Sequence, residues 1–454
     1  MHEKADEPAR HWHGFGGLRM TCDLGSRKVA GMPERRFFRD EQFEFAMRLA
    51  VGSTYHRVAE VGECLATAAR ISERDYEGWF REWSRTAERV EGVARDCEAR
   101  GHPVSAREAY LRASTCFFTA SIFLDATDRP QQLVPTWERH RACWDRAAAL
   151  FDPPFEPVLI PYEGTTLPGY WMSPDSTGRS RPLLLMNNGS DGPISDMYVF
   201  GGAGGLARGY SVLAYDGPGQ GAALYRQGLN LRPDWERVVT PVVDYALSRD
   251  DVDAERIALY GASMGGYMVA RAAAFEPRIA AVITDPGVWD VAAPSDSPLS
   301  RLVRRSTRRF WRAPIDAVAA GLAARGPRRL RHTLRFGMRP YGTGSLVEML
   351  TLLREYNLDG IAGRISCPLL VLDPEGEQFW PGEAQRVRDS AGGPTALVHF
   401  SADEGGALHM QPLARGLSDQ RILDWLDKTF ARTGDAAPPE DGATVGTPPG
   451  GGAP

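Results

Sequence analysis

The spacing of apolar residues divides the chain into two parts. From residue 39 to about 150, segments such as "EFAMRLAVGSTYHRVAEVGECLATAARI" and "YEGWFREWSRTAERVEGVARDCEARG" carry apolar residues at intervals of three and four. This period is typical of amphipathic helices. From residue 156 onward, the apolar residues form short runs instead. We therefore predict an N-terminal helical domain over residues 35–150 and a second domain, which contains strands, over 151–431.

The short runs predict the strands of a mostly parallel sheet. "EPVLIPYEGTTLPGYWMSP" (156–174) predicts two strands around a turn that contains glycine. The later runs are continuous rather than alternating, and helix-length segments separate them. These runs are 182–187, 211–216, 256–261, 280–285, 368–373 and 396–400. Continuous apolar runs are typical of strands covered on both faces, so we predict a doubly wound α/β fold.

Three segments fall outside this pattern. The interval after the run 280–285 is too long for one crossover helix, and we predict that it contains an inserted helical lid over about 291–350. The middle of this interval has many arginines and a single acidic residue, Asp316. Residues 1–34 show no sustained period, which predicts a flexible arm. Pro, Gly and Ala dominate 432–454, which predicts a disordered tail.

The composition argues against two classes of partner. The formal net charge is −5, whereas general nucleic-acid binders are usually strongly basic. No run of eighteen apolar residues occurs, so we expect no transmembrane helix and no membrane partner. The start of the chain lacks the apolar core of a signal peptide, and we expect a cytoplasmic protein.

The sequence indicates no metal and no cofactor. The six cysteines show no C-x-x-C spacing, which predicts reduced thiols in or near the core rather than a zinc site or a disulfide framework. The glycine-rich "GGAGGLARG" lacks the G-K-[ST] ending of a phosphate loop. We interpret it as helix packing and assign it no nucleotide.

The stretch "LYGASMGGYM", Leu259 to Met268, predicts a nucleophile. Its G-x-S-x-G pattern alone is a weak signal in a chain with 48 glycines. An apolar run precedes it and a helical pattern follows it, and a nucleophile elbow requires that strand–turn–helix context. The serine of such an elbow has strained backbone angles, and a side chain at Gly261 or Gly265 would clash. We therefore predict that Ser263 is the nucleophile.

A serine nucleophile needs a histidine base later in the chain. Of the nine histidines, only His399 and His409 come late enough for the order Ser, acid, His. His399 lies inside the apolar run "TALVHF", whereas His409 lies beyond it in the loop "SADEGGALHMQP". We predict that His409 is the base.

The acid should follow the run "PLLVLD". The stretch "LDPEGEQFWPGEA" offers Asp373, Glu375 and Glu377. Hydrolases with this elbow often carry the acid about four residues before a proline that opens the next helix, and Pro381 then favours Glu377. A carboxylate there would orient the histidine and stabilise its imidazolium form. Asp373 and Glu375 remain alternatives.

An oxyanion hole requires two N–H donors. One should be the N–H of Met264, directly after the nucleophile. The other should come from the loop "NGSDGP" (188–193), where Ser190 or Asp191 is the candidate.

Several motifs together resemble one family. "YDGPGQG", the elbow "GASMGGYMVARAAAFEPRIAA" and the helical segments "DYEGWFREWSRTAERV" and "SAREAYLRAS" look like those of the α/β-hydrolases with an N-terminal helical domain. Dihydroxypseudooxynicotine hydrolase and the fungal polyketide-shortening hydrolases of pigment synthesis typify this family. The resemblance covers roughly residues 40–430.

The resemblance implies an α/β-hydrolase fold and hydrolysis of a carbon–carbon bond next to a ketone, as in a β-diketone. It places the triad on Ser263, Glu377 and His409, with the site between the core, the lid and the helical domain. The chain departs from the family at the acid, because aspartate is common where Glu377 stands.

The chemistry of the triad suggests which residues contact the substrate. Ser263 would attack a carbonyl carbon, and cleavage would then expel an alkoxide from an ester or an enolate from a β-diketone. An enolate needs a proton donor or extra stabilisation, from His409 or from an acid after the sixth strand such as Asp285 or Asp290. The alternative role of those acids is to cap a helix in "TDPGVWD". The expected substrate contacts are Tyr267, Asp285, Trp289 and Asp290.

Three classes of function fit these residues. A hydrolase would act on a bulky keto or ester substrate such as a polyketide or alkaloid. An acyltransferase or cyclase would use the same acyl-enzyme and exclude water. A non-catalytic ligand-binding protein would keep the fold, but an intact Ser, acid and His argue against it. We interpret the arginine-rich part of the lid either as a solvated helical face or as a surface for an anionic substrate or an acyl carrier protein. The helical domain would supply the interface of a homodimer.

Overall fold

A computed structural model describes residues 36–293 and 309–434 of the chain. The predicted arm at 1–34 and residues 435–454 of the predicted tail lie outside this range, as does the segment 294–308. Across the described residues, no helix combines the length and the hydropathy needed to cross a bilayer. The five cysteines in the described range are free thiols, and Cys64, Cys116 and Cys143 are buried.

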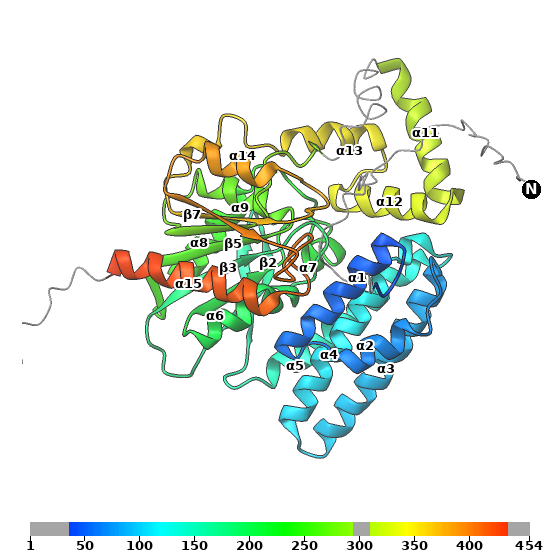
Figure 1. Ribbon diagram of the computed structural model, residues 1–454, viewed down its shortest axis with the longest axis horizontal. Coiled ribbons are helices and arrows are strands. Elements are labelled where there is room, and N and C mark those ends of the chain that lie inside the picture. Colours follow the sequence, from blue (N-terminus) through cyan, green and yellow to red (C-terminus); the bar gives the residue numbers. More distant parts are fainter. Residues whose placement is uncertain (1–35, 294–308, 435–454) are drawn as a thin grey trace, which may run out of the picture.

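The N-terminal region is helical, as the period of three and four predicts (Figure 1). Its main helices are α1 (Glu41–Gly52), α2 (Val61–Ala68), α3 (Tyr76–Ala99), α4 (Pro103–Ser121) and α5 (Leu133–Ala149). Large aromatic side chains fill the space between them. Phe43 and Trp79 are fully buried with ring centroids 4.6 Å apart, and Trp79 Nε1 donates to the carbonyl of Thr119 at 2.7 Å. The buried indole thus finds the partner that its polar nitrogen requires.

The second part is built on one sheet of eight described strands in the order β1-β2-β4-β3-β5-β6-β7-β8. The strands are β1 (Glu156–Tyr162), β2 (Thr165–Met172), β3 (Arg181–Asn187), β4 (Ser211–Tyr215), β5 (Val252–Ala262), β6 (Ala281–Asp285), β7 (Leu369–Pro374) and β8 (Thr395–Phe400). β1 and β2 form an antiparallel hairpin, β2 is also antiparallel to β4, and the remaining pairs are parallel. Every predicted strand is confirmed, and so is the mostly parallel sheet.

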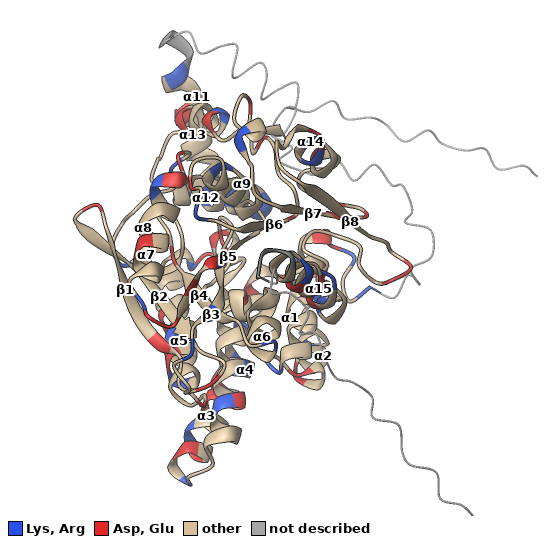
Figure 2. Cartoon of the chain, turned by 90° about the vertical axis from the view of Figure 1, so that its left-hand side faces the viewer, with Lys and Arg blue, Asp and Glu red and all other residues tan. Residues whose placement is uncertain are grey.

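Helices cover both faces of the sheet, and Figure 2 shows α6 and α15 on one side and α8, α9 and α14 on the other. Their bounds are α6 (Ala203–Ala207), α7 (Gly221–Tyr225), α8 (Glu236–Leu247), α9 (Gly265–Ala273), α14 (Glu383–Ser390) and α15 (Arg415–Gly434). Successive strand residues point to opposite faces. Leu184 and Met186 join the core that contains the N-terminal helices and α15, whereas Leu183 and Leu185 join the core that contains α8 and α9. The continuous apolar runs follow from this double covering.

A buried ion pair joins the N-terminal helices to the sheet. Arg141 of α5 donates from Nη1 to Asp216 Oδ2 at 3.1 Å, and Asp216 directly follows β4. The Asp216 carboxylate also accepts the N–H of Ala222 at 2.9 Å. Both side chains of the pair are nearly inaccessible, so removing either partner would leave a buried charge without compensation.

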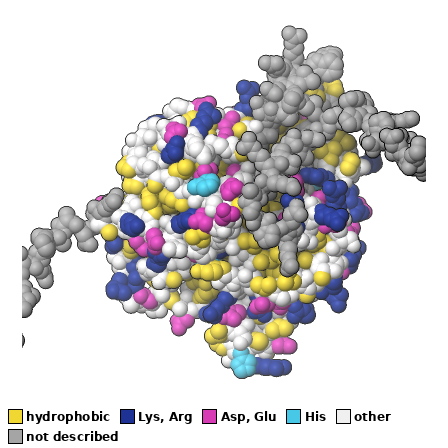
Figure 3. All heavy atoms as spheres, viewed as in Figure 1, with side chains coloured by type: hydrophobic (Ala, Val, Ile, Leu, Met, Phe, Trp, Pro, Cys, Tyr) yellow, Lys and Arg dark blue, Asp and Glu magenta, His cyan; other side chains and the backbone are white. Residues whose placement is uncertain are grey.

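Further helices lie between β6 and β7, where the lid is predicted. They are α11 (Arg309–Arg325), α12 (Arg328–Met338) and α13 (Leu346–Leu352). Arg331 of α12 donates to Asp128 at 3.1 Å and to the carbonyl of Ala126 at 2.8 Å, and Arg339 pairs with Asp125. Part of the arginine-rich stretch therefore holds the inserted helices against the N-terminal region, which Figure 1 shows beside α12. On the face seen in Figure 3, cationic and acidic side chains are interspersed.

Candidate active site

Ser263 lies at the sharp turn between β5 and α9. Its φ of +56° is in the left-handed region, which is strained for a residue other than glycine. A Cβ added to Gly261 would lie 2.2 Å from the Gly265 carbonyl oxygen, and one added to Gly265 would lie 2.9 Å from that of Asn188. The flanking glycines are therefore required by backbone crowding, as the motif predicts. The N–H of Ser263 donates to the carbonyl of Asp285 at 2.6 Å, which ties the turn to the end of β6.

Ser263, His409 and Glu377 form one chain of hydrogen bonds. His409 Nε2 lies 2.9 Å from Ser263 Oγ, and its Nδ1 lies 3.0 Å from both carboxylate oxygens of Glu377. Because a carboxylate only accepts, Nδ1 carries the proton and Nε2 is free to accept from the serine hydroxyl. The side chains of His409 and Glu377 are 5% and 6% exposed, so the contact is shielded from water.

The surroundings of Glu377 keep it ionised. Its Oε1 accepts the N–H of Phe379 at 2.8 Å and that of Trp380 at 3.3 Å. Burial alone raises the pKa of the Glu377 carboxyl, but the adjacent His409 and the two N–H donors outweigh burial and lower the pKa overall. An ionised carboxylate at this place orients the imidazole and stabilises its protonated form.

Aromatic rings surround the imidazole of His409. The ring centroids of Phe379 and Trp380 lie 4.7 and 5.8 Å from it, and that of Phe45 lies at 6.1 Å. Phe45 belongs to α1, so the N-terminal region reaches this histidine. The same helix ends at Gly52, where an added Cβ would lie 1.6 Å from the carbonyl oxygen of Pro412. Helix α1 is thus packed against the loop that carries His409.

The alternative acids and the alternative histidine have other partners. Asp373 accepts from His399 Nδ1 at 3.0 Å and from Gln385 at 2.7 Å. Glu375 accepts the N–H of Ala402 at 2.7 Å through its carboxylate. Only Glu377, of the three candidate acids, hydrogen-bonds to His409 in the described part of the chain.

The loop after β3 lies directly against Ser263. A Cβ on Gly189 would lie 2.8 Å from Ser263 Cβ and 3.3 Å from its Oγ, so only glycine lets this backbone approach so closely. Gln220 Nε2 donates to the carbonyls of Asn188 and Gly189 at 2.8 and 2.7 Å. Gln220, the Gln of "YDGPGQG", thus holds the loop in place. Our sequence reasoning used this motif as a signature of the family and missed its positioning role.

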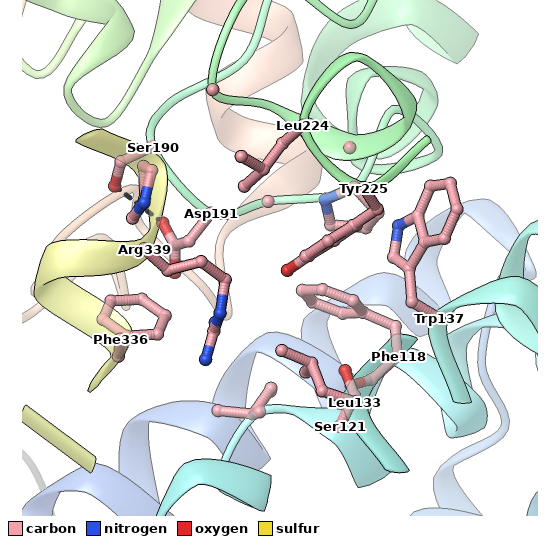
Figure 4. Close-up of a pocket in the computed structure, with 16 residues that line it drawn as sticks. Phe118, Ser121, Leu133, Trp137, Ser190, Asp191, Leu224, Tyr225, Phe336 and Arg339 are labelled. Carbon is pink, nitrogen blue, oxygen red and sulfur yellow. Dashed lines mark hydrogen bonds between the residues drawn. The ribbon is translucent and has the colours of Figure 1, made fainter. Parts of the chain in front are cut away.

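A cavity opens beside this loop, and Figure 4 shows Ser190 and Asp191 at its edge. Three parts of the chain supply its walls: helices α4 and α5, the loop after β3 with the segment after β4 that includes α7, and the inserted helix α12 with the residues that follow it. The lining residues are Phe118, Ser121, Ile122, Leu133, Trp137, Ser190, Asp191, Gly192, Pro193, Gly219, Gly221, Leu224, Tyr225, Phe336, Arg339 and Pro340. The walls are therefore mostly apolar and aromatic, with few polar groups, as in a small-molecule site.

Two of the expected substrate contacts point into the protein instead. Tyr267 is fully buried, and its hydroxyl donates to the carbonyl of Pro233 at 2.9 Å. Trp289 packs beneath the Arg386 guanidinium and donates from Nε1 to Asp359 at 2.9 Å. Neither lines the cavity. The turn of α9 carries Tyr267 away from Ser263, and proximity in sequence to the elbow did not reveal that direction.

Asp285, the last residue of β6, and Asp290, which follows β6, do not line the cavity either. Asp285 is fully buried and accepts from Tyr260 at 2.8 Å and from Gln411 at 2.9 Å. Asp290 accepts the N–H of Ala292 at 2.8 Å. This bond to the backbone two residues on is an Asx turn. In the described part of the chain, no three His, Cys, Asp or Glu side chains gather as a metal ion would require.

Comparison with known proteins agrees with this fold. The prolyl oligopeptidase family matches residues 205–300, which include the elbow. Hydrolase acrC of Aspergillus aculeatus is 32% identical over 429 residues, which is 87% of this chain and 98% of acrC. The 20-hydroxy-prefusarin hydrolase FUS2 of Gibberella moniliformis is 30% identical over 418 residues, which is 87% of this chain and 98% of FUS2.

Among solved structures, 2,6-dihydroxy-pseudo-oxynicotine hydrolase shares the fold with a TM-score of 0.64 at 20% identity. The match covers 84% of this chain and 95% of that one. The chain belongs to the family of these fungal hydrolases, and it is an α/β-hydrolase enzyme with an N-terminal helical region. The predicted fold class and the predicted resemblance are both confirmed.

Proposed function

We propose that this enzyme is a serine hydrolase that forms an acyl-enzyme on Ser263 and cleaves a carbon–carbon bond next to a ketone, or an ester, in a bulky small molecule. The observation that carries the proposal is the shielded hydrogen-bond chain from Ser263 through His409 to Glu377. Such a chain activates a hydroxyl that is otherwise a weak nucleophile.

Each residue has one role in the proposed reaction. His409 Nε2 accepts the proton of Ser263 as Oγ attacks the carbonyl carbon. The N–H of Met264 and the N–H of Ser190 or Asp191 stabilise the oxyanion. The N–H of Gly189 donates to its neighbour Asn188 at 2.7 Å, which favours the next two residues of the loop as oxyanion donors. Water then attacks the acyl-enzyme with His409 as its base.

The walls of the cavity support a bulky, largely apolar substrate. Phe118, Trp137, Tyr225 and Phe336 offer aromatic surface from three different parts of the chain. The resemblance to the dihydroxypseudooxynicotine hydrolase family supports a carbon–carbon bond flanked by a ketone as the bond that breaks. FUS2 is named for its action on 20-hydroxy-prefusarin, and we extend to this chain only the general class of a natural-product carbonyl compound.

A fluorophosphonate probe tests the nucleophile. We expect the wild-type enzyme to be labelled on Ser263 and the Ser263→Ala variant to remain unlabelled. Asp175→Asn, far along the chain on an exposed turn, is the matched surface control and should label at the wild-type rate. Labelling of Ser263→Ala at the wild-type rate would contradict the proposal.

Product analysis in ¹⁸O-labelled water tests the reaction. A hydrolase incorporates one solvent oxygen into the acid that leaves Ser263, whereas an acyltransferase or cyclase incorporates none. We expect incorporation with aryl β-diketones and with p-nitrophenyl esters. Turnover without ¹⁸O in the acyl product would show acyl transfer instead.

A further inference from the structure

Asp191 places a carboxylate inside the apolar cavity. It lies two residues after Gly189, the residue packed against Ser263, and both Asp191 and its neighbour Ser190 line the cavity. Figure 4 shows the two side chains together, with Ser190 Oγ 3.2 Å from Asp191 Oδ1. Asp191 therefore belongs both to the wall of the cavity and to the loop that packs against Ser263.

Within residues 36–293 and 309–434, a hydroxyl rather than a cation is hydrogen-bonded to this carboxylate. Among the described side chains, no Lys, Arg or His forms an ion pair with Asp191, whose hydrogen-bonding partner is the Ser190 hydroxyl. Arg339 also lines the cavity, but its guanidinium pairs with Asp125 of the N-terminal region. Titratable groups that face a cleft and have a shifted pKa concentrate at functional sites.

The protonation state follows from this environment. Asp191 is an exposed residue, yet the protein around its carboxyl displaces part of the water there, and this desolvation raises the pKa of the Asp191 carboxyl. The hydroxyl of Ser190 and the nearby His409 oppose the rise without cancelling it. The group is thereby suited to carry a proton that it can give to a ligand in the cavity.

We infer that Asp191 donates a proton to the carbon leaving group when the carbon–carbon bond breaks. The inference rests on the proposed function and names the residue that would make it a carbon–carbon hydrolase rather than only an esterase. Asp285 and Asp290, the acids first considered for this step, are turned away from the cavity, whereas Asp191 lies in it.

The step balances as follows. The Ser263 proton moves to His409, and Oγ bonds to the ketone carbon. The tetrahedral intermediate collapses, the carbon–carbon bond breaks, and its electron pair goes to the leaving group as an enolate. The enolate takes the proton of Asp191 and departs as a ketone.

His409 and Asp191 are then reset before hydrolysis. The imidazolium of His409 returns one proton to the Asp191 carboxylate, so that neutral His409 can take a proton from the attacking water. Hydroxide bonds to the acyl carbon, the ester bond to Oγ breaks, and Ser263 recovers its proton from His409. The sum is one diketone and one water converted into one carboxylic acid and one ketone.

Two substrates distinguish a role of Asp191 in protonating the leaving group from a general role in catalysis. Cleavage of an aryl β-diketone requires protonation of the enolate, whereas p-nitrophenolate leaves an ester without a proton. Asp191→Asn should lower kcat on the β-diketone by about 10²–10⁴-fold, the usual contribution of a positioned proton donor. Hydrolysis of the p-nitrophenyl ester should change little, and Asp191→Glu should restore part of the diketone activity.

Two controls guard against a merely structural effect. Asp175→Asn removes a carboxylate at a residue that does not line the cavity, and it should leave the diketone-to-ester ratio unchanged. Fluorophosphonate labelling of Asp191→Asn at the wild-type rate would show that Ser263 is still activated.

An equal loss on both substrates, or unchanged diketone cleavage by Asp191→Asn, would overturn the inference and leave the proposed function standing. A wild-type enzyme that hydrolyses the ester but no β-diketone would instead contradict the carbon–carbon reaction itself, and the proposed role of Asp191 with it.

Discussion

Two carboxylate–imidazole pairs lie near the ends of β7 and β8. Asp373 with His399, and Glu377 with His409, each join a carboxylate oxygen to Nδ1 at 3.0 Å. The exposed fractions differ: the His399 and Asp373 side chains are 55% and 15% exposed, against 5% and 6% for His409 and Glu377. Only His409 has its second nitrogen against Ser263. The comparison shows that the same chemical pair becomes a catalytic candidate through its environment.

The difference arises from where each residue lies relative to the strand ends. Asp373 and His399 lie within β7 and β8 and directly face each other in the parallel register, so the pleat fixes their direction. Glu377 and His409 lie in the loops beyond, which turn back over the elbow. Glu375 braces these loops, because its carbonyl accepts the N–H of Leu408 at 2.8 Å and its carboxylate accepts that of Ala402.

Replacing each histidine by alanine gives the largest expected difference. His409→Ala should lower kcat by about 10⁴-fold or more, because the serine loses its base. His399→Ala should leave kcat close to the wild-type value, since its pair is solvent-exposed and does not contact Ser263. Steady-state hydrolysis of a p-nitrophenyl ester measures both. Comparable losses in the two variants would break the distinction between the pairs.

Replacing each acid by its amide should give a smaller difference of the same kind. Glu377→Gln should lower kcat by about 10³–10⁴-fold, because an amide orients the wrong tautomer of His409 and cannot stabilise its charge. Asp373→Asn should be nearly silent in the same assay. If Asp373→Asn were the impaired variant, the acid would have to be reassigned to β7.

The smallest expected effect is on the free energy of unfolding at acidic pH. The pKa of Glu377 is lower in the folded protein than in the unfolded chain, so its contribution to stability is present above the unfolded pKa of about 4.3. That contribution is lost as the pH falls through the folded value. Urea unfolding between pH 3 and 7 should therefore show a steeper loss for the wild type than for Glu377→Gln.

His409→Ala is the control for this titration, because it removes the imidazole that lowers the pKa of Glu377. Like Glu377→Gln, this variant should lose free energy of unfolding less steeply than the wild type as the pH falls. If the free energy of unfolding of both variants fell with pH as steeply as that of the wild type, protonation of the buried pair would not be linked to folding.

Much of the framework was predictable from local patterns. The apolar runs revealed every strand because buried parallel strands leave a continuous signal. Chain order separated His409 from the earlier histidines, and Pro381 favoured the glutamate that contacts His409 in the structure. These inferences use residues that are close in sequence or constrained in order.

The cavity could not be predicted in this way. Its walls join Trp137, Leu224 and Phe336, which are far apart in the chain and meet only in the fold. The ion-pair partners of Arg141 and Arg339 could not be predicted either. The sequence around an arginine does not indicate which distant carboxylate it will contact in the fold. The directions of Tyr267 and Trp289 were equally hidden, and their role as substrate contacts stays a prediction.

The close packing of α1 on the histidine loop has a consequence for how this enzyme can change. Phe45 lies beside His409, and no side chain larger than hydrogen fits at Gly52 against Pro412. The N-terminal region that lines part of the cavity therefore also packs against His409. If these helices were exchanged between relatives, the shape of the cavity and the packing around His409 would therefore change together.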